Sequence, residues 1–148
     1  MKKVNLYLAN SIRGPRHTDG VVGYVLEFVR EGKEPVTTTN FRVVREVTRN
    51  VAELRILALA LSKINENCDL TIYTDSTYLA AGLEKWLEQW KKNDWQTKEG
   101  KPVANKTEWQ FLLKTLFRHQ FSLVVGEKHS YSSWLDAELQ HRKDALKK

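Results

Sequence analysis

The chain has 148 residues, of which 41% are hydrophobic and 28% are charged. This composition is typical of a folded globular protein, and the length suits a single domain over residues 1–148. The longest apolar run, residues 56–61, is too short to span a membrane, and the polar N-terminus does not resemble a secretion signal. A single cysteine, Cys68, excludes an internal disulfide, so a cytoplasmic location is expected.

The net charge of +6 is concentrated in two segments. Residues 85–106 carry six lysines against three acidic residues, and residues 141–148 carry four basic residues against one acidic residue. A basic segment interspersed with tryptophan favours nucleic-acid binding more strongly than net charge alone does. The alternative is a solvated loop, with Trp86, Trp90 and Trp109 in the core and Trp95 partly exposed.

The first part of the chain alternates between polar and apolar residues. This alternation predicts strands around residues 4–8, 21–30 and 36–47. Because the connections between them are short, the three strands are expected to form an antiparallel meander.

The second part of the chain changes to helical spacing. Apolar residues three or four apart predict a helix over residues 51–64, and β-branched residues predict a strand over 70–74. The same patterns predict five further elements: a helix over 79–90, a polar loop over 91–106, a helix over 109–117, a strand over 121–125 and a helix over 133–146. Asn50 with Glu53 and Asn105 with Glu108 are expected to cap two of these helices.

The resulting order is βββ-α-β-α-α-β-α. The later crossovers imply parallel strands. The sequence therefore predicts an α/β fold with a mixed five-stranded sheet, three antiparallel strands followed by parallel ones, and flanking helices.

Three carboxylates lie at the ends of predicted elements. Asp75 ends the strand over 70–74, while Glu53 and Asp136 lie near the starts of two helices. If these ends meet, the acids would suit Mg²⁺ or Mn²⁺ and phosphodiester hydrolysis. The alternatives are that Glu53 and Asp136 favour the helix dipole and that Asp75 caps a helix. His129, in a polar loop, is either a proton shuttle or a surface residue.

The motifs around Asp75 resemble those of the ribonuclease H family. Residues 72–78 read IYTDSTY, residues 90–95 read WKKNDW, and residues 101–103 read KPV. The resemblance covers essentially the whole chain and is strongest to the bacterial single-domain type with a basic protrusion. It implies a ribonuclease H-like fold and Mg²⁺-dependent hydrolysis of the RNA strand of RNA/DNA hybrids.

The resemblance also assigns roles to individual residues. It implies that Glu53, Asp75 and Asp136 are catalytic metal ligands and that His129 is the loop histidine that assists product release. Residues 85–106 match the basic protrusion. The nucleic-acid contacts implied by the resemblance and by the basic segment are Thr48, Asn50, Lys85, Lys91, Lys92, Trp95, Lys98, Lys101 and Lys106.

The first strand departs from the family pattern. The family's strand ends in Thr-Asp-Gly-Ser, whereas residues 7–11 read YLANS, so either Ala9 or Asn10 replaces the first aspartate. Since both metal ions of the family share that aspartate, weak metal binding is expected here. Asp19 is the nearest acidic residue in the sequence that could replace the missing aspartate. Two functions stay open: a hybrid-cleaving nuclease with impaired activity, and a non-catalytic module that binds hybrid or duplex RNA or serves as an accessory domain.

Overall fold

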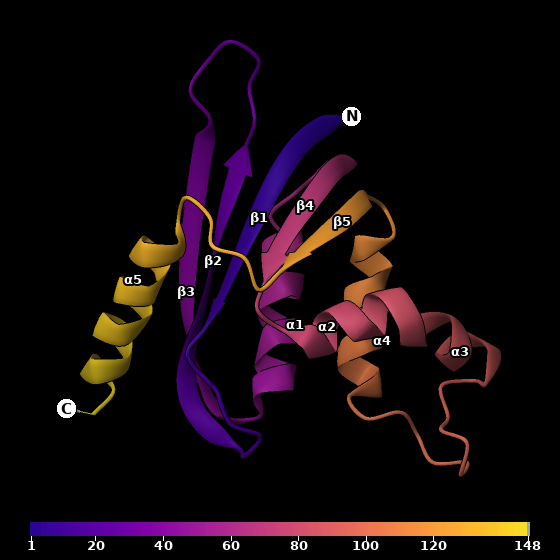
Figure 1. The fold of residues 1–148 in the computed structure, drawn as a ribbon. Helices are drawn as coiled ribbons and strands as arrows, with labels where there is room; N and C mark the ends of the chain where they lie inside the picture. Colours follow the sequence, from indigo (N-terminus) through magenta and orange to yellow (C-terminus); the bar gives the residue numbers. More distant parts are fainter. Residues whose placement is uncertain (148) are drawn as a thin grey trace.

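Five strands form one mixed sheet in the computed structural model, which describes residues 1–147 (Figure 1). The spatial order is β3-β2-β1-β4-β5. The pairs β1–β2 and β2–β3 are antiparallel, and the pairs β1–β4 and β4–β5 are parallel, which confirms the predicted mixed sheet. The strand bounds are β1 Lys2–Asn10, β2 Thr18–Phe28, β3 Val36–Val47, β4 Cys68–Thr74 and β5 Gln120–Val125.

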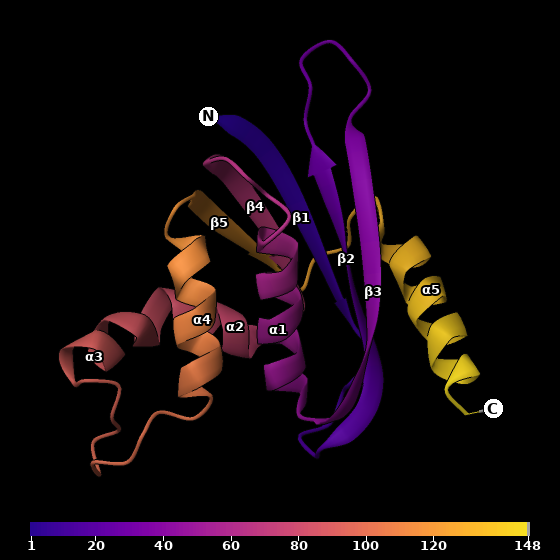
Figure 2. The same cartoon turned by 180° about the vertical axis from the view of Figure 1, so that it is seen from behind.

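The helices cover both faces of this sheet. Helices α1, α2 and α4 lie on one face, and α5 lies on the other (Figures 1 and 2). No helix among residues 1–147 is both long and apolar enough to cross a membrane. The bounds are α1 Arg49–Leu61, α2 Thr77–Ala81, a π-helical turn Gly82–Trp86, α3 Leu87–Lys92, α4 Lys106–Leu116 and α5 Ser132–Ala145.

The central strand β1 is buried on both faces, and its alternation divides the core in two. Leu6 and Leu8 point into the main core under α1 and α4. Tyr7 and Ala9 point the other way, into a smaller cluster with residues of α5. Because side chains alternate along a strand, Asn10 shares the face of Leu6 and Leu8.

The two predicted capping boxes are wrong. The hydroxyl of Thr48 caps α1 by accepting a hydrogen bond from Val51 N at 3.2 Å. The helix begins earlier than the sequence suggested, so Asn50 and Glu53 lie inside it. Asn105 precedes α4 in a left-handed conformation (φ 61°), and its side chain donates to Tyr78 Oη at 3.1 Å instead of capping the helix.

The predicted helix over 79–90 is interrupted by the π-helical turn. Gly82 lies against the ring of fully buried Trp109, and a Cβ at this position would overlap the indole. A π turn contains one residue more than an α turn and therefore rotates the residues that follow. Trp86, the last residue of this turn, is 37% exposed, so its predicted core position is wrong, whereas Trp90 and Trp95 pack against the core.

Candidate functional site

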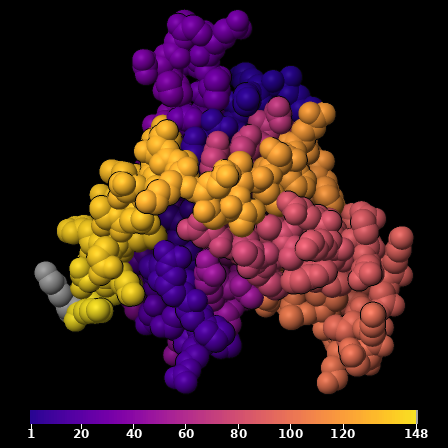
Figure 3. Space-filling model, in the orientation of Figure 1, coloured from indigo at the N-terminus to yellow at the C-terminus, as the bar shows by residue number. Residues whose placement is uncertain are grey.

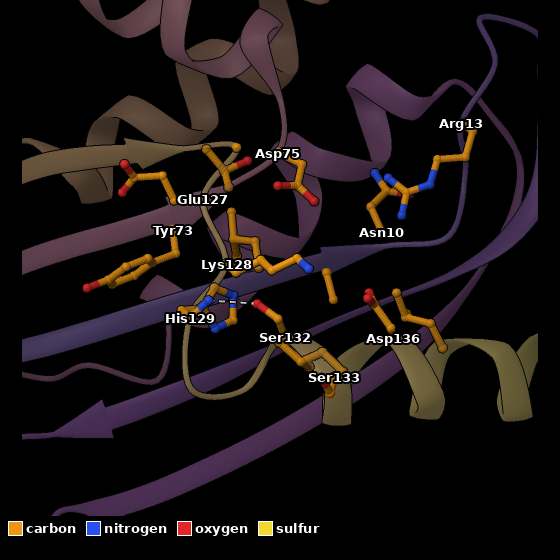
Figure 4. Close-up of a pocket in the computed structure, with 16 residues that line it drawn as sticks. Asn10, Arg13, Tyr73, Asp75, Glu127, Lys128, His129, Ser132, Ser133 and Asp136 are labelled. Atoms are coloured by element: carbon orange, nitrogen blue, oxygen red, sulfur yellow. Dashed lines mark hydrogen bonds between the residues drawn. The ribbon is translucent and has the colours of Figure 1, made fainter.

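A cavity of about 350 Å³ opens at the carboxyl ends of β4 and β5, beside the end of β1 (Figure 4). This is where sheets with parallel strands usually bind ligands. Figure 3 shows the same region of the surface, where α5 and the segment before it lie against β1 and β2. The polar and charged lining residues are Asn10, Arg13, Thr74, Asp75, Glu127, Lys128, His129, Ser132, Ser133 and Asp136.

Asn10, rather than Ala9, occupies the position at the end of β1 that faces Glu53. Its amide donates to Glu53 Oε1 at 3.1 Å and to Arg49 O at 3.2 Å, and its Oδ1 accepts from Ile12 N at 2.9 Å. Asn10 is only 6% exposed, and Ala9 packs in the cluster beneath α5. The parity of the apolar stripe Val4, Leu6, Leu8 was the sequence signal that could have placed Asn10 on this face.

Glu53 is buried, and both of its carboxylate oxygens are engaged. Oε1 accepts from Asn10, and Oε2 accepts from Thr74 Oγ1 at 2.5 Å. Burial raises the pKa of Glu53 above its ordinary value, against the opposing effect of the hydrogen bonds from Thr74 and Asn10. Because α1 has no acidic residue in its first turn, the helix-dipole explanation for Glu53 is wrong.

Asp75 and Asp136 are exposed and share the cavity. Ser76, not Asp75, caps α2, because its hydroxyl accepts from Leu79 N at 3.0 Å. Asp136 lies beyond the first turn of α5, which contains no acidic residue. The dipole and capping explanations for these two carboxylates are therefore also wrong.

The imidazole of His129 is held in one orientation. Its Nδ1 accepts a hydrogen bond from Tyr131 N at 3.1 Å, and its ring centroid lies 4.5 Å from that of Tyr7 and 5.4 Å from that of Tyr73. With Nδ1 accepting, the hydrogen of the neutral ring is on Nε2. Burial lowers the pKa of His129, although the nearby carboxylates of Asp75 and Asp136 oppose this effect. The ring is thus fixed as a hydrogen-bond donor.

The half-buried carboxylate of Glu27 anchors the loop that carries His129. Tyr131 Oη donates to Glu27 Oε2 at 2.6 Å, while Asn5 Nδ2 and Tyr7 Oη donate to Glu27 Oε1 at 2.9 and 3.2 Å. Burial raises the pKa of Glu27, but these hydrogen bonds outweigh that effect and hold the pKa below its ordinary value. The sequence carries no signal for this network, because no local pattern pairs residues that are 104 positions apart.

Asp19 does not replace the missing aspartate. Its carboxylate accepts from Glu46 N at 2.9 Å and forms an ion pair with Arg45 at 3.1 Å, and it does not line the cavity. The cavity instead contains two cations that were not among the predicted site residues, Arg13 and Lys128 (Figure 4). The side chain of Lys128 extends into the space between the carboxylates.

The residues present do not fit a pair of divalent ions bridged by carboxylates. Among residues 1–147, no three His, Cys, Asp or Glu side chains lie close enough together to hold a metal ion. At the end of β1, the amide of Asn10 directs its NH₂ at Glu53 Oε1, so a neutral donor rather than a second carboxylate faces Glu53. The ligand roles of Glu53, Asp75 and Asp136 stay predictions.

The basic segment projects from the body of the molecule beside α4 (Figure 1). Helix α3 extends to Lys92 and α4 begins at Lys106, so only residues 93–105 form the predicted loop. The ammonium of Lys91 lies 4.2 Å from the ring centroid of Phe117. Of the predicted contacts in this segment, Lys85, Lys91, Lys92, Lys98 and Lys101 are exposed, and Lys106 and Trp95 are partly buried.

Thr48 and Asn50 line a separate hollow of about 340 Å³ at the start of α1. This hollow also contains Arg49 and Asn105, and it shares Arg13 with the cavity that holds the carboxylates. The structure therefore brings Thr48 and Asn50 close to the cavity. Their contacts with nucleic acid stay predictions.

Comparisons with known proteins agree with this architecture. The RNase H family model matches residues 1–132. A ribonuclease H of Clostridium botulinum is 35% identical over 149 residues, covering 99% of this chain and 93% of that protein.

Solved structures share the fold. The crystal structure of LC9-RNase H1, a type 1 RNase H with the type 2 active-site motif, is similar with a TM-score of 0.79 and 20% identity, covering 98% of this chain and 74% of that one. The foamy viral protease-reverse transcriptase in complex with RNA/DNA hybrid is similar with a TM-score of 0.66 and 17% identity, covering 93% and 19%. From the family match, the close relative and this fold, the chain belongs to the ribonuclease H family.

Proposed function

We propose that residues 1–148 act as one ribonuclease H-like domain that binds RNA/DNA hybrids and cleaves their RNA strand slowly or not at all. The observation that carries this proposal is the hydrogen bond from the buried amide of Asn10 to Glu53. Hybrid binding is supported by the projecting basic segment and by family membership. The foamy viral structural neighbour was itself solved with a hybrid.

Binding follows from the chemistry of the basic segment. Exposed lysines neutralise backbone phosphates and release counterions, which gives an affinity that falls with salt and depends little on sequence. A hybrid would be recognised by its groove shape and its 2′-hydroxyls. Thr48 and Asn50 are suited to such polar contacts, because both line the hollow beside the cavity.

Impaired cleavage follows from the charge of the site. In the family, Mg²⁺ or Mn²⁺ supplies the activated water and stabilises the leaving oxygen. Here an amide stands where the family has a carboxylate, so the site carries one negative charge less, and that amide donates a hydrogen bond to Glu53. Asp75 and Asp136 share the exposed cavity with His129, which favours weak residual hydrolysis as the second candidate function.

Hybrid binding is tested by titrating a labelled RNA/DNA hybrid in EDTA at several salt concentrations. Lys91→Glu with Lys92→Glu should weaken binding and reduce the slope of log affinity against log salt by about 2, because two phosphate contacts are lost. A matched control is Lys33→Glu with Lys63→Glu, which makes the same charge change at exposed positions outside the segment.

The control variant should keep the slope of the parent. An affinity that does not depend on salt, or equal losses in the two double variants, would contradict a role for the basic segment. Duplex RNA and duplex DNA serve as competitors: displacement by duplex RNA supports the alternative of a duplex-binding module.

A further inference from the structure

We infer a second site for backbone phosphate, on the opposite side of the carboxylate cavity from the basic segment. It is a hollow of about 280 Å³ between the loop after β1 and helix α5. This inference rests on the proposed function and extends the path of the nucleic acid onto α5. Its lining residues are Ser11, Arg13, Asp136, Leu139, Gln140 and Lys143.

The spacing along α5 builds one wall of this hollow. Asp136, Gln140 and Lys143 are four and three residues apart and therefore lie on one face of the helix. Leu139, beside these residues on α5, is buried against the sheet and holds the helix in place. A strand of nucleic acid that passes Asp136 in the cavity would therefore continue past Gln140 and Lys143.

Arg13 joins the site to the rest of the predicted interface. It is exposed, and it lines the carboxylate cavity, the hollow with Thr48 and Asn50, and the hollow on α5. Neither Arg13 nor Lys143 forms an ion pair among residues 1–147. The two cations are thus available to an external anion.

The chemistry of the lining favours a phosphate diester. Arg13 and Lys143 outnumber the single carboxylate of Asp136, and Arg offers paired N–H donors that match phosphate oxygens. Gln140 is held in place, because its Nε2 donates to Asp144 Oδ1 at 2.9 Å. This hollow shares Arg13 with the hollow at the start of α1, so a phosphate bound by Arg13 would lie at the border of the two.

The same helix provides a matched control cation. The guanidinium of Arg142 lies 4.2 Å from the ring centroid of Phe41, and its Nε is paired with Glu138 at 3.3 Å. Arg142 therefore lies toward β3 and does not line the hollow. Arg142→Ala removes one positive charge from α5 without changing the proposed site.

The experiment compares hybrid affinity of Arg13→Ala, Lys143→Ala, the double variant and Arg142→Ala in EDTA over a range of salt concentrations. Each single variant at the site should weaken binding about 5- to 10-fold at 0.1 M salt and reduce the slope of log affinity against log salt by about 1. The double variant should reduce that slope by about 2. Arg142→Ala should keep the parent's slope. Melting curves check that all four variants are folded.

The possible outcomes separate this inference from the proposed function. If Lys91→Glu with Lys92→Glu weakens binding while the slopes of Arg13→Ala and Lys143→Ala equal the parent's, the second site is wrong and the proposed function stands. Equal losses in Arg142→Ala and Lys143→Ala would show a general charge effect and also overturn the site. A parent that does not bind hybrid overturns both.

Discussion

The pair Asn10 and Glu53 determines the chemistry of the candidate site. A carboxylate at position 10 would face Glu53 and Arg49 O, two acceptors that lie 3.1 and 3.2 Å from the amide nitrogen of Asn10. The amide supplies the two hydrogens that these acceptors need, and its oxygen accepts from Ile12 N. Both carboxylate oxygens of buried Glu53 are therefore hydrogen-bonded, one by Asn10 and the other by Thr74.

Asn10→Asp tests this electrostatic role. In EDTA at neutral pH, the variant should lose about 3 kcal/mol of stability, or roughly 10 °C in melting temperature, because two carboxylates would meet in a buried site. Acidification to pH 5 should recover part of the loss by protonating one of them. The measurement is thermal unfolding followed by circular dichroism.

Asn10→Ala is the matched control, because it removes the donor without adding a charge. It should cost about 1–2 kcal/mol, less than Asn10→Asp. If Asn10→Asp melts at the temperature of the parent in EDTA, the amide does not stabilise Glu53 in the way described.

At the scale of elements, buried His119, the residue before β5, joins that strand to the start of β4. His119 Nδ1 accepts from Cys68 N at 3.0 Å, and its Nε2 is buried without a partner among residues 1–147. Burial lowers the pKa of His119 below its ordinary value. Protonation would place a hydrogen on Nδ1 against the Cys68 N–H, so this junction requires the neutral ring.

The stability of the fold should therefore fall in acid. In the unfolded chain the imidazole of His119 has its ordinary pKa of about 6.5, and in the folded chain its pKa is lower. The unfolded chain therefore takes up the proton first, and stability is lost as the pH falls below about 6.5. His119→Asn, whose Oδ1 can replace Nδ1 as acceptor, should flatten this decrease between pH 7 and 5. Denaturant unfolding at each pH measures it; equal pH dependence in parent and variant would contradict the explanation.

The contact between Gly82 and Trp109 sets how closely the π-helical turn approaches α4. Gly82→Ala would drive a methyl group into the fully buried indole and should destabilise the protein by about 1–3 kcal/mol. Gly14→Ala is the control, since no heavy atom lies within 4 Å of its added Cβ. Urea unfolding compares the two, and equal midpoints would show that the indole can yield.

At the scale of the whole molecule, the sheet was predictable and the interior of the site was less so. Alternation and helical spacing predicted all five strands and their directions, because each element buries one face against the same core. The choice between Ala9 and Asn10 depended on strand parity, which an alignment to the family motif obscured. The contact of Glu27 with Tyr131 and the π-helical turn arise from packing between distant segments, for which the sequence offers no local signal.

We propose that this ribonuclease H-family chain binds hybrid but lacks the charge needed to cut it efficiently. The most direct test incubates a labelled RNA/DNA hybrid with the parent and with Asn10→Asp, in Mg²⁺ and in Mn²⁺. We expect the parent to leave the RNA strand largely intact and Asn10→Asp to cleave it. Efficient metal-dependent cleavage by the parent, abolished in Asp75→Asn, would contradict the claim.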